Sequence, residues 1–508
     1  MAAGHKACVN TLRKITVEPV LLLYMYASYL SFSAFMAITY DKSCLSLYNS
    51  TFCTDLDNKT FAKVHKSQQD DVQATSSGWM MRSNIAMGVP STLSLLLWMG
   101  SWGDRVGRRL PLVVPCAGDV LYSVCNLINA IYMDASPAFL MIGQVFSGLS
   151  GGYLAMLMAS YTYLTHLASP DRRMMRVGVA EAAVFLAGTI SVFLSGKLVD
   201  TLGFVPVFGI SLGCQVAAFV YAIFILPDIK PTLEEKGDNS TGRCQGVFLR
   251  PLRDMWTFVT TSRDSQTRLH LTLLILVINI LQFCTTGEGD VLLLYLKRAP
   301  RSWSYTTYGY FKGAENFTRG ATVLIILPLL KQLTSLRDTT LIMAGHVSKM
   351  AGLILLGLAK ETWVIFLVVG VAALQGFPSA GLRASMAGLV NKNEQGRLFG
   401  VVAATESITS SLSTVAFNGL YPLTLDFYDG FCFQMAAFLV FICFFVVLYQ
   451  HVTFKRSGIL NAQGDRNKET KESEGRMSGR GSYRRHRIIP LNLAVERSLS
   501  RDPQQNYT

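Results

Sequence analysis

The sequence predicts an all-α membrane protein with twelve transmembrane helices arranged in two six-helix halves. Half of its 508 residues are hydrophobic and only 16% are charged, whereas a soluble domain carries roughly 25% charged residues. Apolar runs of about 20 residues, long enough to cross a hydrocarbon core of roughly 30 Å, recur along the chain. The longest polar connection within this array divides it six and six, which is the layout of membrane proteins built from two repeats.

The predicted spans follow one another closely. Residues 1–18 lack the pattern of a cleaved signal peptide, so we expect a cytoplasmic N-terminus and a first span that directs its own insertion. An N-terminal half, 19–226, holds spans at 19–40, 78–100, 110–132, 138–166, 176–198 and 203–226. A cytoplasmic central loop, 227–269, precedes a C-terminal half, 270–452, with spans at 270–297, 306–331, 338–359, 362–390, 397–420 and 430–452.

The net charge of +13 is concentrated in the tail, 453–508. This segment is rich in Gly, Ser, Arg and Lys and poor in aromatic residues, so we predict a disordered cytoplasmic tail. We expect it to be solvated or to touch anionic membrane lipid, and we expect no nucleic-acid partner. The ten cysteines show no metal-ligand spacing, so we predict neither a metal site nor a cofactor.

The distribution of Lys and Arg predicts the orientation of the chain. Basic residues fill the loop between spans 2 and 3, the loop between spans 4 and 5, and the central loop. By the positive-inside rule, both termini are therefore expected in the cytoplasm. Lys297, Arg298 and Arg301, between spans 7 and 8, are an exception, because they would then lie outside.

The long loop between spans 1 and 2, 41–77, is expected to face outward. It carries the glycosylation sequons Asn49-Ser50-Thr51 and Asn58-Lys59-Thr60. We therefore predict glycans on Asn49 and Asn58. Cys44 and Cys53 share this loop, and the oxidising compartment would allow them to form a disulfide.

The segment "GSWGDRVGRR", residues 100–109, turns the chain between spans 2 and 3. Gly100 and Gly107 permit a tight reversal and a close approach of helices. Asp104 can accept hydrogen bonds from a helix N-terminus, and Arg108 can pair with a carboxylate. We predict a conformational gate that breaks when the halves move apart. The alternative is an arginine cluster that only fixes orientation.

This pattern at this position resembles the loop signature of the major facilitator superfamily. Four further motifs resemble solute carrier family 46, the family of the proton-coupled folate transporter: "VEP", "VGVAEAAVFLAG", "LRASMAGLVNKNEQGRLFG" and "FNGLYPLTLDFYDG". The resemblance implies alternating access around a central cavity. It also implies an organic anion as substrate, such as a folate, a conjugated steroid or a bacterial cell-wall peptide, often driven by protons.

Ionisable residues within spans cost about 2.5–3.5 kcal/mol on insertion scales, so each is a functional candidate. Arg383 in span 10 is predicted to pair with Glu406 in span 11, or with the substrate. Glu181 in span 5 is predicted to take up the proton, with Glu406 as a second coupling residue. The resemblance matches Glu181 and Arg383 to residues implicated in coupling and substrate binding. The alternative is a static ion pair. Glu315 and Arg319, four residues apart in span 8, are expected to pair with each other.

Span 7 departs from the pattern of the family. The resemblance implies a proton-coupling histidine where this chain has Thr285. Glu288 lies one turn further on the same face, and Asp290 follows it. The two glycines of "TTGEGD" predict a local break that opens backbone groups to a cavity. We expect Thr285 and Asp290 to contact substrate and Glu288 to replace the histidine, or both acids to mark the outer mouth.

Together these features predict a proton symporter of a small organic anion in the plasma membrane, with the lysosomal membrane as the alternative location. An enzyme is disfavoured, because the sequence has no metal-ligand spacing, nucleophile elbow or nucleotide-binding loop. A scaffold or receptor of the same fold would tolerate neutral residues at Glu181 and Arg383. A channel is a weaker alternative, because no charged ring or filter motif is visible.

Overall fold

The computed structural model describes residues 17–56, 58–95, 107–167, 173–228, 264–334, 336–390 and 395–457. The chain divides into two compact units, Met1–His451 and Val452–Thr508. Of the second unit only the end of the last helix is described, so most of the predicted tail lies outside the described residues. The first unit holds the helices that follow.

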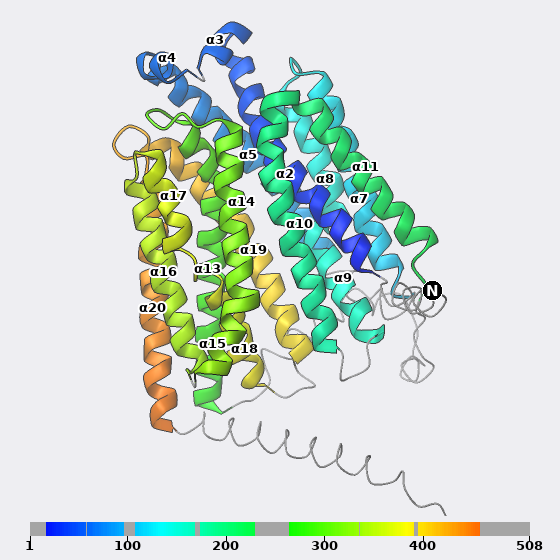
Figure 1. Cartoon of the computed structure of the whole chain (residues 1–508), viewed down its shortest axis with the longest axis vertical. Coiled ribbons are helices and arrows are strands. Elements are labelled where there is room, and N and C mark those ends of the chain that lie inside the picture. The colour runs from blue at the N-terminus through cyan, green and yellow to red at the C-terminus, as the bar shows by residue number, and fades with distance from the viewer. Residues whose placement is uncertain are drawn as a thin grey trace, which may run out of the picture. The chain divides into compact units, whose positions relative to one another are not determined.

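The first half of this unit contains a helical counterpart of each of the first six predicted spans (Figure 1). The long helices are α2 (Glu18–Leu47), α5 (Lys66–Ser94), α7 (Leu110–Ile131), α10 (Arg173–Leu202) and α11 (Phe204–Phe224). The fourth span consists of the short turn η2 (Pro137–Phe139) followed by α8 (Leu140–Leu149) and α9 (Gly152–Leu167). Two further short helices, α3 (Ser50–Asp55) and α4 (Lys59–Val64), lie between α2 and α5.

The second half repeats this plan. Its continuous helices are α13 (Ser265–Lys297), α16 (Asp338–Leu358), α19 (Gln395–Thr424) and α20 (Phe431–Ser457). The eighth span joins α14 (Tyr305–Ala321) through the π-helical turn η4 (Thr322–Ile326) to α15 (Leu327–Leu333). The tenth span is divided into α17 (Thr362–Val371) and α18 (Phe377–Gly388).

Nine helices within the described residues are long and apolar enough to cross a membrane. The other predicted spans are carried by α5, α14–α15 and α17–α18. These are too polar or too interrupted to count among the nine. The first turns of α5 are polar, α14 carries Lys312, Glu315 and Arg319, and α17–α18 is interrupted. Polar residues inside a span are tolerated where they face protein, and α5 and α14 both pack between other helices.

The predictions for the loop 41–77 and for span 7 were wrong in detail. The loop is mostly helical, because α2 continues to Leu47 and α5 already begins at Lys66. The segment "TTGEGD" does not break its helix, because α13 runs without interruption from Ser265 to Lys297. A Cβ atom at Gly287 would lie 2.1 Å from the Phe417 ring, so this glycine admits a neighbouring side chain rather than a bend.

The breaks occur instead in the fourth and tenth spans. Between α8 and α9, Gly151 and Gly152 have φ angles of 89° and 59°, a backbone conformation that favours glycine. Two serines of α5 satisfy carbonyl groups at this break, since Ser91 donates to Gly151 (3.0 Å) and Ser94 to Leu149 (2.8 Å). Such partners allow an interrupted helix at membrane depth.

The two halves meet along α10 against α14 and along α5 against α19. Glycines make the first contact close. A Cβ atom at Gly309 would lie 2.9 Å from the carbonyl oxygen of Val192, and one at Gly196 would overlap the carbonyl oxygen of Tyr305. Small residues of this kind allow helix backbones to approach within a membrane.

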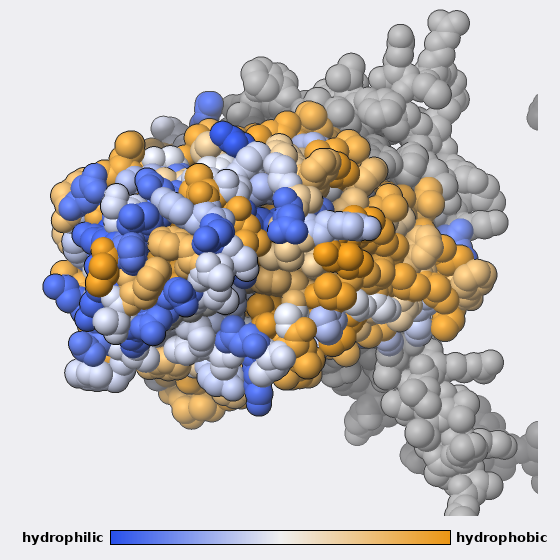
Figure 2. Space-filling view, turned by 90° about the horizontal axis from the view of Figure 1, so that it is seen from above, coloured by the Kyte–Doolittle hydropathy of each residue, from blue (hydrophilic) through white to orange (hydrophobic). Residues whose placement is uncertain are grey.

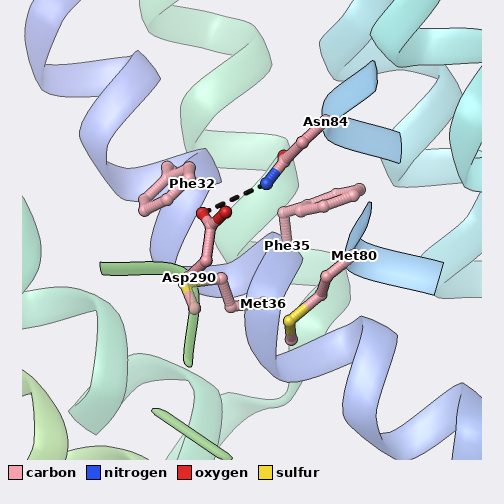
Figure 3. A pocket seen from close by; sticks show the side chains of 6 residues that line it. All are labelled: Phe32, Phe35, Met36, Met80, Asn84 and Asp290. Atoms are coloured by element: carbon pink, nitrogen blue, oxygen red, sulfur yellow. Dashed lines mark hydrogen bonds between the residues drawn. The ribbon is translucent and has the colours of Figure 1, made fainter. Parts of the chain in front are cut away.

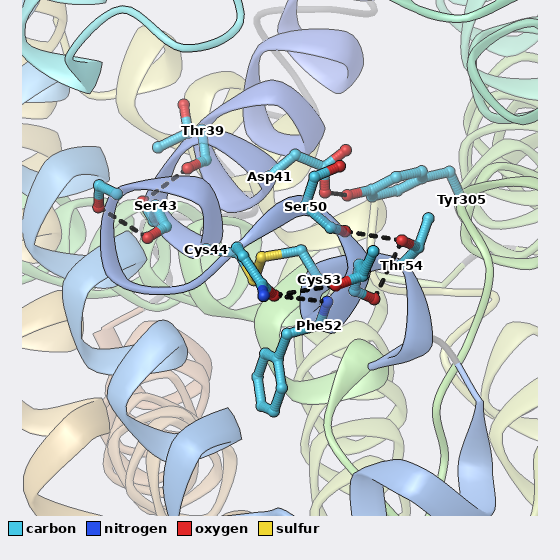
Figure 4. Close-up of a disulfide and its surroundings, with 12 residues drawn as sticks. Thr39, Asp41, Ser43, Cys44, Ser50, Phe52, Cys53, Thr54 and Tyr305 are labelled. Carbon is cyan, nitrogen blue, oxygen red and sulfur yellow. Dashed lines mark hydrogen bonds between the residues drawn. A yellow bond between two sulfur atoms is a disulfide. The ribbon is translucent and has the colours of Figure 1, made fainter.

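One end of the unit carries α3 and α4, and we call it the α3/α4 end (Figure 1). Here Cys44 and Cys53 are joined by a disulfide, with Cα atoms 5.9 Å apart (Figure 4). Asn49 and Asn58 are exposed N-caps of α3 and α4 and accept from the amides of Phe52 and Thr60, each at 3.0 Å. From above, hydrophilic side chains gather on the left part of this face (Figure 2).

Candidate functional site

An ion pair between α18 and α19 is the centre of the candidate site. Nη2 of Arg383 donates to both carboxylate oxygens of Glu406, at 2.8 and 2.9 Å. The Arg383 side chain is 44% exposed and that of Glu406 is 16% exposed. The pairing predicted from the sequence is therefore present, and the guanidinium remains accessible to a ligand.

Aromatic and cationic side chains from other helices surround this pair. Tyr153 of α9 is 45% exposed, and its hydroxyl is within electrostatic reach of Glu406, Arg383 and Arg319. The guanidinium of Arg319 in α14 also lies within electrostatic reach of the Tyr29 hydroxyl in α2. Tyr153 thus links the ion pair of Arg383 and Glu406 to Arg319 and Tyr29, and this group of cationic and aromatic side chains from both halves suits an organic anion.

This site lies at the edge of the contact between the halves. Along α5 and α19, hydrogen bonds join Ser77 to the Asn418 carbonyl (2.9 Å) and Thr92 to Ser407 (2.7 Å). Glu406 directly precedes Ser407. The ion pair therefore sits just beyond the last of these hydrogen bonds, on the side away from the α3/α4 end.

The predicted span-7 residues occupy two separate sites. Glu288 is buried and accepts from Lys349 of α16 at 3.1 Å, so it forms an ion pair within its own half. Thr285 is half-buried one turn earlier on α13. Asp290 is buried and accepts from Asn84 of α5 at 3.1 Å. Neither acid is brought to Arg383.

The expected pair in span 8 was wrong. Glu315 accepts from Lys312 at 2.7 Å and from Gln375, between α17 and α18, at 2.8 Å. Lys312 lies three residues from Glu315 on the same helix face. Arg319, four residues away, is therefore available to the group around Tyr153.

The described residues include only part of the other predicted sites. The side chain of Glu181, on α10, lies outside them, and so do Gly100 and Asp104. Gly107 has φ 128°, and a Cβ atom there would lie 2.5 Å from Oδ1 of Asp228. Arg108 is buried, and Nε of Arg109 donates to the carbonyl of Ala222 at 2.9 Å. The described part of this turn thus packs on the end of α11, in its own half.

The exceptional cations between spans 7 and 8 are buried at the α3/α4 end. Arg298 donates to both oxygens of Asp70 in α5, at 2.7 and 2.8 Å, and Arg301 pairs with Asp429. Lys297 lies 4.1 Å from the centroid of the Tyr305 ring. The carboxylate partners of Arg298 and Arg301 account for two of the three exceptional cations, because these two arginines present no uncompensated charge.

Arg298 connects three segments of the chain. Besides Asp70 it contacts Asp429 (3.4 Å) and the carbonyl of Leu425 (3.1 Å). Burial lowers the pKa of the Arg298 guanidinium, but the hydrogen bonds and charge of Asp70 outweigh this and raise the pKa above its ordinary value. Sequence reasoning missed Asp70 and Asp429, although the misplaced arginines themselves were the signal that carboxylates must lie near.

Further hydrogen bonds, from neutral donors to carboxylates, join the two halves near this end. Asp200 of α10 accepts from the amide (2.7 Å) and hydroxyl (2.6 Å) of Thr306, and Asp41 of α2 accepts from the Tyr305 hydroxyl at 2.6 Å (Figure 4). All three bonds join the two halves. In the part of the chain that the structure describes, no group of three or more His, Cys, Asp or Glu side chains is placed to hold a metal ion.

Sequence comparisons agree with this geometry. A profile of the Major Facilitator Superfamily matches residues 20–414. The chain is 28% identical over 375 residues to the proton-coupled folate transporter of Rattus norvegicus, which covers 73% of this chain and 78% of that protein. It is 24% identical over 441 residues to a lysosomal proton-coupled steroid conjugate and bile acid symporter of Gallus gallus, and this match covers 85% of this chain and 93% of that protein. Solute carrier family 46 member 2 of Mus musculus is 23% identical over 443 residues, and this match covers 82% of this chain and 91% of that protein.

Solved structures show the same fold. The human organic anion transporter MFSD10 superposes with a TM-score of 0.60 at 16% identity, covering 85% of this chain and 97% of that one. A POT family transporter in complex with 5-aminolevulinic acid superposes with a TM-score of 0.57 at 13% identity, and the match covers 87% of this chain and 96% of that one. The predicted fold class and the resemblance to solute carrier family 46 are confirmed. The relatives are solute transporters and not enzymes.

Proposed function

Because the chain belongs to the Major Facilitator Superfamily and is a secondary active transporter of organic substrates, we propose that it moves a small organic anion together with protons. The observation that carries this proposal is the exposed guanidinium of Arg383, which donates to Glu406 and lies, like Arg319, within electrostatic reach of Tyr153. The names of the relatives, a proton-coupled folate transporter and a proton-coupled symporter of steroid conjugates and bile acids, favour the same class of substrate.

In this mechanism the substrate anion competes with Glu406 for Arg383. A carboxylate or sulfate accepts the same charge-assisted hydrogen bonds that Glu406 now accepts. Protonation of Glu406 releases the guanidinium, which couples proton uptake to substrate binding. Glu181, on the neighbouring α10, is proposed as a further proton-coupling residue, and Thr285 as a contact with the substrate.

Alternating access then requires that the two ends open in turn. The ion pair of Arg298 with Asp70 of α5 joins the two halves and holds the α3/α4 end closed, while Arg383 remains exposed beyond the contact between the halves. We assign this arrangement to the inward-facing state. The turn with Gly100, Asp104, Gly107 and Arg108 is proposed as the gate that closes the opposite end.

The proposed orientation places both termini in the cytoplasm and the α3/α4 end outside or in a lumen. Exposed Asn49 and Asn58 would then carry glycans, and the disulfide would form in an oxidising compartment. Plasma membrane is the proposed location, with the lysosomal membrane as the alternative because one relative is lysosomal. Lipid is the surrounding partner of the protein.

The test is uptake by cells with the protein at their surface, at pH 5.5 and 7.4. Labelled folate, a sulfated steroid, a bile acid and a muramyl peptide serve as probes. We expect acid-stimulated uptake of one anionic probe, and a loss of at least about tenfold in Arg383→Gln, since a charge-assisted hydrogen bond contributes roughly 1.5–3 kcal/mol. Lys331→Gln is the matched control, because Lys331 forms an exposed pair with Asp338.

Two outcomes would contradict the proposal. Uptake that is equal at both pH values would remove proton coupling. If surface expression is confirmed and every anionic probe fails, the scaffold or receptor interpretation becomes the better one.

A further inference from the structure

Asp290 is a buried acid within a span, and its described hydrogen-bond partners are all neutral. Its Oδ1 accepts from the amide of Asn84 at 3.1 Å (Figure 3). Its Oδ2 accepts from the hydroxyl of Thr414 at 2.7 Å and from the amide of Asn418 at 3.1 Å. The residue itself is only 5% exposed.

No charged side chain among the described residues neutralises this carboxylate. The charged residues of the elements packed around it are engaged elsewhere: Glu288 with Lys349, Glu406 with Arg383, Arg82 over the Trp79 ring, Asp41 with Tyr305, and Lys42 with backbone carbonyls. A buried carboxylate without a cation is costly when ionised. The site is therefore suited to taking up a proton.

A small pocket gives access to Asp290. It is lined by Phe32, Phe35, Met36, Met80, Asn84 and Asp290 (Figure 3), and Phe32 is 44% exposed. The pocket is far smaller than the roughly 300–1,000 Å³ of small-molecule sites. Its walls are apolar and its one charge is negative, so it admits water and protons rather than an organic anion.

One hydrogen bond of Asp290, from Asn84, also crosses the contact between the halves. Asn84 belongs to α5 of the first half, whereas Thr414 and Asn418 belong to α19 of the second. Ser77 of α5 adds a second link to Asn418. A hydrogen bond to an ionised acceptor is roughly twice as strong as a neutral one, so protonation weakens the link between α5 and α13–α19.

We propose that Asp290 binds the coupling proton, and that its charge sets how firmly α5 is held to the second half. This inference rests on the proton coupling of the proposed function. It changes the expected role of Asp290 from substrate contact to proton carrier. It also adds a proton site apart from the anion, with the anion competing with Glu406 at Arg383 and a further proton bound at the pocket.

Asp119 of α7 provides a matched control. It is likewise buried and accepts from neutral groups, the hydroxyls of Ser147 (2.6 Å) and Ser28 (3.2 Å) and the amide of Gln215 (3.5 Å). These partners all come from the first half, and Asp119 does not line the pocket. It shares the chemistry of Asp290 without the link between the halves.

The first test is infrared spectroscopy of the purified full-length protein in lipid bilayers during a pH titration. We expect carbonyl absorption of protonated carboxyl groups that grows as the pH falls, with one component that is lost in Asp290→Asn and retained in Asp119→Asn. A second variant, Asn84→Ala, keeps the carboxyl group but removes one donor to its ionised form, so its band should persist to higher pH. An unchanged band in both Asp290→Asn and Asn84→Ala overturns the proposal.

The second test measures opening of the α3/α4 end. Gln73 is fully buried one turn from Ser77 on α5, so Gln73→Cys reports opening through labelling by a membrane-impermeant maleimide. Labelling is normalised to Val64→Cys, because Val64 is 76% exposed, and the protein with only its native cysteines gives the background. We expect severalfold more labelling at pH 5.5 than at 7.5, and pH-independent labelling after Asp290→Asn.

Labelling of Asp290→Asn that still depends on pH as in the wild type would overturn the coupling role. Neither test uses a substrate. A failure of uptake therefore leaves these results interpretable, and a failure here leaves the proposed transport of anions in place.

Discussion

Arg383 and Glu406 form an ion pair that is open to water on one side, and this exposure limits what the pair adds to stability. Exposed ion pairs contribute about 0–1 kcal/mol, whereas a buried pair that loses one partner costs about 3–5 kcal/mol. The chain contains both kinds. The Lys349 and Glu288 side chains are only 5% and 9% exposed, against 44% for Arg383.

For the exposed pair, Arg383→Gln should change the thermal unfolding of the purified protein little, within about 1 kcal/mol. Uptake should fall much further, and Arg383→Lys should restore part of it because the charge returns. Loss of stability that matches the loss of uptake would identify Arg383 as a structural residue instead.

For the buried pair, Lys349→Met should destabilise the protein by about 3–5 kcal/mol, because Glu288 would be left as an uncompensated charge. Adding Glu288→Met should recover most of that loss, since two apolar side chains of similar volume fill the same space. The measurement is thermal unfolding in detergent. Without recovery in the double variant, the pair would have a role beyond mutual neutralisation.

At the scale of helices, the contact between α10 and α14 depends on glycine at a few positions. The backbone of Tyr305 occupies the place where a side chain of residue 196 would start. Gly213 on α11 is a suitable comparison, because nothing lies within 4 Å of the position its Cβ atom would take. Both glycines lie inside a helix of the first half.

Gly196→Ala should therefore push α10 from α14 and lower the free energy of unfolding by about 1–3 kcal/mol, as overpacked cores do. Gly213→Ala should leave stability unchanged or raise it slightly, because alanine favours a helix over glycine. The measurement is thermal unfolding of the two variants, compared with that of the wild type. Equal effects would show that helix propensity, and not the contact, governs both positions.

Hydropathy predicted the helices well and their interruptions poorly. Every predicted span has a helical counterpart, because about 20 apolar residues impose a helix in a membrane. The glycines of "TTGEGD" suggested a break, yet Phe417 packs against Gly287 and α13 continues. The real break at Gly151 relies on Ser91, a partner from another helix that no local pattern reveals.

In the candidate site, too, the sequence did not reveal the partners that come from other helices. The pair of Arg383 and Glu406 was predictable, because each is costly alone in a span. The partners of Glu288 and Asp290 were not, because Lys349 and Asn84 come from helices whose rotation the sequence leaves open. Glu315 shows the difficulty within one helix, since Lys312 and Arg319 both lie within reach and packing selects Lys312.

For the whole molecule, the ion pairs at the α3/α4 end favour one of two states. Asp70→Asn removes the carboxylate that receives two hydrogen bonds from Arg298, so the end should open more often. We expect severalfold more maleimide labelling of Gln73→Cys at neutral pH. Asp71→Asn is the control, because Asp71 is exposed and its described hydrogen bond is to Tyr48. Unchanged labelling in Asp70→Asn would show that other contacts hold the end closed.

The buried arginines also impose an order on biosynthesis. Asp70 is translated before Arg298, but Asp429 emerges 128 residues after Arg301. Until α19 and α20 are made, the hairpin of α13 and α14 must keep Arg301 on the far side of the membrane without its carboxylate. A nascent chain that stops after α16 should therefore tend to invert this hairpin, as the positive-inside rule favours. The final two helices thus complete the topology of segments synthesised long before them.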